Sequence, residues 1–259
     1  MRIAILVVTV LSIILVTVLF NQYEGLIRQV AKHPSFTFSS TETLNIKPSK
    51  TDTLFLKDSV IPVYHFGSDS LTTKMILLPG LGFYLDDWFS LCEKLSTNGI
   101  HVITFPMEFS NTHHDYSWGV ADRTVLTMML DSLQNTDSLT ITAFDFGTLS
   151  LDNLSVRPST KINLINPRLT RSEFLSQLAD LSFGFSLTAP IKNIMDEFSS
   201  RMMFQDTISF QISQKTHFFF NPNIIIAEKF LNSNRTVFSD NWEYGKINVN
   251  ETAEAILKR

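Results

Sequence analysis

Short apolar runs alternate with helical patterns along most of this 259-residue chain, and no other feature constrains its fold so strongly. Alternation of this kind is typical of βαβ units, which build a parallel sheet with helices on its faces. The predicted strands and helices follow one another at 75–78, 87–97, 100–105, 118–133, 139–144, 148–156 and 161–165. An α/β fold with a mostly parallel sheet is therefore expected.

Other patterns extend this sheet at both ends. Residues 53–56 and 60–66 alternate or run apolar around a polar Lys57-Asp58 pair, as the two strands of a hairpin do. Further along, a helical stretch rich in Phe, Leu and Met interrupts the alternation, and we expect a lid within about 170–215. The remaining strand candidates are 217–220, 224–226 and 236–238, and the closing helix is 251–258.

The amino terminus carries an uncharged apolar run from Ile3 to Phe20. A hydrocarbon core about 30 Å thick requires ~20 helical residues, which is close to the length of this run. A cleaved secretory signal is the alternative, but such signals usually end in small residues, whereas Asn21 to Tyr23 follow here. We therefore expect a transmembrane anchor or signal-anchor over 1–22, a linker over 23–50 and an α/β domain over 51–259.

The charges around this run are nearly balanced, because Arg2 precedes it while Arg28 and Lys32 follow it. Insertion with the short amino-terminal tail inside is the simplest arrangement. The α/β domain is then expected on the outer side of a membrane, whether periplasmic, extracellular or lumenal.

Net charge and cysteine content exclude several classes of protein. With a net charge of −4, the chain lacks the excess of basic residues that binds phosphate backbones, so nucleic acid is not an expected partner. The single cysteine, Cys92, cannot form an intrachain disulfide, and its apolar helical pattern indicates core packing. No Cys/His spacing resembles a zinc site, so we expect no metal and no cofactor. His65 and His101 occupy strand positions and are interpreted as structural.

The segment Ala143-Phe144-Asp145-Phe146-Gly147 stands between a predicted strand and a predicted helix. It resembles the nucleophile elbow of the α/β-hydrolase superfamily, where small residues on both sides of the nucleophile let the strand and helix backbones come close. Asp145 occupies the nucleophile position. Upstream, Leu77 to Phe83 resembles the glycine-containing loop after the superfamily's third strand, with Pro79 where many members have histidine.

This resemblance implies an α/β-hydrolase-like fold with Asp145 as the nucleophile. In the aspartate branch of the superfamily, which includes haloalkane dehalogenases and epoxide hydrolases, the carboxylate attacks and forms an enzyme ester. Backbone N–H groups for the oxyanion are expected from Phe146 and from the loop residues Gly80, Leu81 and Gly82.

The histidine that the superfamily carries after its last strand is missing from residues 239–245. Another base is needed, because water does not readily hydrolyse an ester intermediate without one. His113 and His114 are candidates because they follow the predicted strand 100–105, at the sheet edge where ligands bind. Glu243 is a third candidate if burial raises its pKa.

The acid that orients the base is also missing, because Asn166 and Asn221 or Asn223 occupy the positions where Asp or Glu is expected. Asp145 itself has an alternative interpretation as the cap of the following helix. Two functions therefore remain open. One is hydrolysis of an apolar ester or acyl substrate, and the other is binding of a ligand or partner by a catalytically inactive relative.

Overall fold

The computed structural model describes residues 2–32, 46–56, 59–80, 85–107, 119–167, 216–220, 234–237 and 248–258. The chain divides into two compact units, and each is described by itself. In the first unit the described element is helix α1 (Arg2–Lys32). Helix α1 continues ten residues past the predicted end at residue 22, so the first part of the predicted linker is helical.

The described side chains of α1 are Ile5 to Leu19 and Asn21. Its large apolar side chains are exposed along this stretch, for example Leu6 at 65% and Val16 at 65%. Within the described part of the chain, no helix combines the length and the apolar character needed to cross a membrane.

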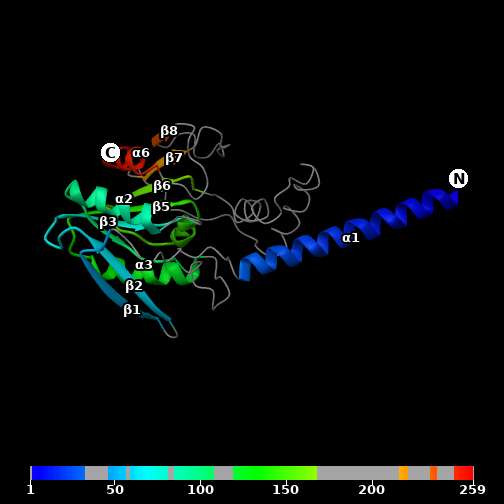
Figure 1. The fold of residues 1–259 in the computed structure, drawn as a ribbon, viewed down its shortest axis with the longest axis horizontal. Coiled ribbons are helices and arrows are strands. Elements are labelled where there is room, and N and C mark those ends of the chain that lie inside the picture. Colours follow the sequence, from blue (N-terminus) through cyan, green and yellow to red (C-terminus); the bar gives the residue numbers. More distant parts are fainter. Residues whose placement is uncertain are drawn as a thin grey trace. The chain divides into compact units, whose positions relative to one another are not determined.

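The second unit is built on an eight-stranded sheet with the order β1-β2-β4-β3-β5-β6-β7-β8. Strands β1 and β2 form an antiparallel hairpin, β2 pairs antiparallel with β4, and every later pairing is parallel. The predicted mostly parallel sheet is thus confirmed (Figure 1). Its strands are β1 (Lys50–Leu56), β2 (Ser59–Phe66), β3 (Thr73–Leu78), β4 (His101–Thr104), β5 (Ser138–Phe144), β6 (Lys161–Ile165), β7 (Thr216–Phe220) and β8 (Asn234–Val237).

Helices cover both faces of this sheet (Figure 1). On one face α2 (Leu85–Thr97) contacts α6 (Val249–Leu257), and both pack on a core that includes Trp88, Phe144 and Phe219. Helix α3 (Val120–Ser132) lies on the opposite side of the sheet. Alternate strand residues point to opposite faces, so both layers are filled by the same apolar runs that predicted the strands.

Three of the expected elements differ from the structure or lie beyond its described part. The helix predicted over 148–156 is wrong in type and bounds, because a 3-10 helix, η2 (Asp145–Leu151), follows β5 and the chain then continues without a helix. Hydroxyl groups of Thr148 and Ser150 bond the carbonyls three residues before them, which matches the 3-10 spacing. The expected lid and the strand candidate 224–226 lie outside the described residues.

Cys92 lies in the core of α2 with no exposed surface, as its sequence pattern predicted. Burial raises the pKa of its thiol well above the ordinary value, since a thiolate is poorly solvated there. This cysteine is therefore an apolar core residue and not a reactive group.

A buried chain of hydrogen bonds links α2 to the middle of the sheet. Trp88 donates its indole N–H to the hydroxyl oxygen of Thr104 at 2.9 Å, and that hydroxyl donates to the carbonyl oxygen of Leu77 at 2.7 Å. Trp88 and Thr104 are both buried, so these hydrogen bonds replace the water that their polar groups lose on folding.

Replacing Thr104 with Val keeps the shape of the side chain but removes the hydroxyl that accepts from Trp88 and donates to the Leu77 carbonyl. We expect Thr104→Val to lower the free energy of unfolding by about 1–3 kcal/mol, the usual cost of an unsatisfied buried donor. Urea unfolding of the full-length protein measures this loss. Thr124→Val is the control, because Thr124 makes its hydroxyl bond on the exposed face of α3 and should change stability little.

Candidate active site

The two segments that resemble an α/β-hydrolase site lie at the same edge of the sheet. Strands β3 and β5 are parallel neighbours, and Leu78 at the end of β3 pairs with Ala143 near the end of β5. The glycine-containing loop therefore begins beside the turn that carries Asp145. The resemblance to the α/β-hydrolase superfamily implied this approach of two segments that are about 65 positions apart in the chain.

Asp145 occupies a strained backbone conformation at the end of β5. Phe144 is still extended, with φ −107° and ψ 132°, whereas Asp145 has φ 43° in the left-handed region. That region costs a residue with a Cβ roughly 1–2 kcal/mol, and such residues cluster at functional sites. The side chain is nearly covered, since Asp145 is 7% exposed.

Gly147 brings the turn against the glycine-containing loop. A Cβ atom at Gly147 would lie 2.6 Å from the carbonyl oxygen of Pro79 and 2.9 Å from that of Leu78, both closer than real contacts allow. Ala143, the other small residue of the elbow pattern, has no exposed surface. The structure thus shows why position 147 needs a residue without a side chain, and position 143 a residue that fits in the core.

The 3-10 helix that follows holds Asp145 in place through contacts that the sequence did not predict. Thr148 donates its hydroxyl to the carbonyl oxygen of Asp145 at 2.6 Å. Gly119, just before α3, has φ 85°, and a Cβ there would lie 2.7 Å from the carbonyl carbon of Leu149. A glycine next to a predicted helix start was the only sequence signal for this second close contact.

Of the remaining predicted site residues, the structure describes some and leaves others outside its described part. Gly80 is buried after β3, and Phe146 is buried directly after Asp145. Phe144 occupies the cap position of η2, so Asp145 is the first helical residue and not the cap. The predicted partners Leu81, Gly82, His113, His114 and Glu243 lie outside the described residues.

Asn166 lies next to Asp145 at the same sheet edge. It follows Ile165, which pairs with Phe144, and it also has a left-handed backbone, with φ 46°. Its backbone N–H donates to the carbonyl oxygen of Phe219 at 2.8 Å. A neutral amide therefore lies at the strand end where the superfamily resemblance implies an orienting acid.

A cavity of about 470 Å³ opens at the other edge of the sheet. Its lining includes Thr73, Ser138 and Lys161, which begin β3, β5 and β6, together with His217 of β7. Since Asp145 follows the carboxyl end of β5, this cavity is separate from the elbow. His217 therefore does not belong with Asp145 in a catalytic group.

Comparisons with solved structures identify the fold. An esterase from Pyrococcus furiosus has a TM-score of 0.53 and 13% sequence identity over 85% of this chain and 93% of its own. A soluble variant of the monoglyceride lipase from Saccharomyces cerevisiae has a TM-score of 0.51 and 11% identity over 83% of this chain and 96% of its own.

An α-β serine hydrolase homologue from Coxiella burnetii has a TM-score of 0.50 and 10% identity over 82% of this chain and 98% of its own. No protein-family model matches the sequence, and no curated protein matches it either. The chain has the α/β-hydrolase fold, which confirms the resemblance seen in the elbow and glycine-containing segments.

Gly147→Ala tests the close contact of the elbow with the loop after β3. Because the added methyl meets backbone atoms that cannot rotate away, we expect it to lower the free energy of unfolding by about 2 kcal/mol or more. Chemical denaturation measures the change. Gly99→Ala is the control: its φ of 83° imposes about 1–2 kcal/mol of strain, but nothing lies within 4 Å of its Cβ position. If Gly147→Ala lowers the free energy of unfolding no more than Gly99→Ala does, the crowded contact at Gly147 is contradicted.

Proposed function

We propose that this protein is a hydrolase that cleaves an apolar ester or acyl substrate at Asp145. The observation that carries the proposal is the left-handed conformation of Asp145, on a turn that Gly147 packs against the Pro79 carbonyl. In the α/β-hydrolase fold, the residue at this turn is the nucleophile that faces the ligand, and here that residue is a carboxylate. Esterases and a monoglyceride lipase with the same fold support the reaction class.

The proposed reaction has two steps. A carboxylate oxygen of Asp145 attacks the ester carbonyl carbon, and the oxyanion accepts hydrogen bonds from the backbone N–H groups of Phe146 and of Leu81 or Gly82. The alkoxide leaves with a proton from the protonated base, and the acyl group stays on Asp145 as an anhydride. That base, one of His113, His114 and Glu243, then takes a proton from water, which releases the acid and restores the carboxylate.

A catalytically inactive relative that binds a ligand or partner is the second candidate function. It is favoured by Asn166, a neutral amide at the strand end beside Asp145, and by the near-complete burial of Asp145. In this case the site around Asp145 binds an apolar molecule or a partner protein but does not cleave it.

Asp145→Asn separates the two functions. With short-chain acyl esters as substrates, we expect the variant of the full-length protein to lose about 10³-fold or more in kcat, since an amide is a poor nucleophile. Asp152→Asn is the matched control, because Asp152 follows the other end of η2 and has the same exposure of 7%. Equal rates in wild type and Asp145→Asn would remove Asp145 from catalysis and favour the binding function.

We also propose that α1 anchors the protein in a membrane, with the α/β domain on the outer side. Apolar side chains along α1 are exposed at 47–65% from Ile5 to Val18, and such a surface is stabilised by transfer from water to lipid. An anchor of this kind would also hold the site near a lipid substrate.

Leu11→Arg tests the anchor, because Leu11 lies near the middle of the apolar run. A charge at the centre of a span costs about 2.5–3.5 kcal/mol, so we expect the variant to move from the alkali-resistant membrane pellet into the supernatant. Asn21→Arg adds the same charge beyond the run and should stay in the pellet. Wild-type protein in the supernatant would contradict the anchor.

A further inference from the structure

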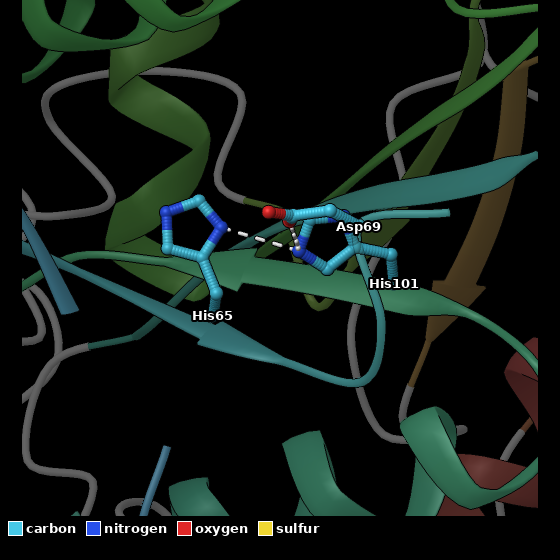
Figure 2. A group of neighbouring side chains, drawn as sticks. All are labelled: His65, Asp69 and His101. Carbon is cyan, nitrogen blue, oxygen red and sulfur yellow. Dashed lines mark hydrogen bonds and ion pairs between the residues drawn. The ribbon is translucent and has the colours of Figure 1, made fainter. Parts of the chain in front are cut away.

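Two histidines and an aspartate meet at the edge of the sheet opposite Asp145. His65 comes from β2, His101 begins β4, and Asp69 lies in the turn between β2 and β3. Figure 2 shows the three side chains pointing toward one another. Nδ1 of His65 lies 3.2 Å from Nε2 of His101, which lies 3.2 Å from Oδ1 of Asp69, and the three ligand atoms all lie within 4.8 Å of one another.

We propose that His65, Asp69 and His101 form a binding site for a divalent transition-metal ion such as Zn²⁺. The ligand atoms are Nδ1 of His65, Nε2 of His101 and a carboxylate oxygen of Asp69. Imidazole nitrogen together with carboxylate oxygen is a common ligand set for zinc.

The spacing of these atoms fits tetrahedral coordination. With metal–ligand distances of about 2.0–2.1 Å, neighbouring ligand atoms of a tetrahedron lie roughly 3.3 Å apart. The two measured separations of 3.2 Å agree with this edge length. The Asp69 side chain is 64% exposed, so its carboxylate can adjust toward the ion and water can reach the fourth position.

The carboxylate of Asp52 lies beside the other ring nitrogen of His65. Nε2 of His65 lies 3.3 Å from Oδ2 of Asp52 across the β1–β2 hairpin, and Lys50 holds the same carboxylate oxygen at 2.6 Å. The negative charge of this carboxylate favours the tautomer with its proton on Nε2, which leaves the lone pair of Nδ1 directed at His101. Metal-binding histidines commonly have a carboxylate beside their other ring nitrogen.

The local electrostatics agree with a metal site. The negative charges of Asp52 and Asp69 favour a cation, while Lys50 and Lys74 are near enough to oppose it. The side chain of His101 is only 2% exposed, so its position is fixed by packing.

The position of the site indicates a structural role for the ion. His101 begins β4, whereas Asp145 follows the far end of the parallel strand β5, so the ion would lie away from the elbow. It would join β2, β4 and the turn that leads into β3. We therefore expect bound metal to raise stability without changing the chemistry at Asp145.

Zinc binding to the full-length, detergent-purified and chelator-stripped protein tests the site. We expect one equivalent to bind and to raise the thermal midpoint. Asp69→Asn should weaken the affinity about tenfold or more by removing a ligand, and Asp52→Asn should weaken it less, by removing the negative charge beside Nε2 of His65. Asp69 and Asp52 are exposed at 64% and 45%, so both variants should fold.

Asp137→Asn is the matched control, because Asp137 is exposed and precedes Ser138, which pairs with Thr73 at the same sheet edge. It removes the same charge outside the cluster and should bind zinc as the wild type does. Absence of stoichiometric binding, or equal affinity in wild type and Asp69→Asn, would overturn the proposal. X-ray absorption should show two imidazoles on the bound zinc, and a spectrum without them would overturn it as well.

Discussion

The contact between Gly147 and the carbonyl oxygen of Pro79 is the constraint on which the candidate active site depends. It draws η2 against the loop after β3, so the chain must turn sharply as it leaves β5. Asp145 is the residue at that turn, and its left-handed backbone is the result. This strained conformation is supported by the buried Thr148 hydroxyl, which donates to the carbonyl oxygen of Asp145.

Much of this arrangement could be predicted from local sequence patterns. The period and length of the apolar runs predicted the strands of the sheet, and the small residues Ala143 and Gly147 predicted that the strand and the following helix come close together. The short η2 could not be predicted in the same way. Leu151 and Leu154 are three residues apart, as in a helix, but Leu154 lies beyond η2. The crowding of Gly119 against Leu149 and of Gly147 against Pro79 comes from tertiary contacts.

The histidine cluster shows a different limit of sequence reasoning. His65 and His101 are 36 residues apart and have no short ligand spacing, so they were interpreted separately as structural residues. The antiparallel pairing of β2 with β4 brings them together, since His65 pairs with Ile103, two residues from His101. Only the register of two strands that are not consecutive in the chain reveals them as a pair.

The enclosed position of Cys92 has a practical consequence for studying this protein. It is the only cysteine in the chain, and its thiol has no exposed surface. Any cysteine introduced at the surface would therefore be the single site for maleimide dyes or spin labels in the native state. One such label on α1 and another on the sheet domain, in separate variants, would report which side of a vesicle each segment occupies without first removing a native thiol.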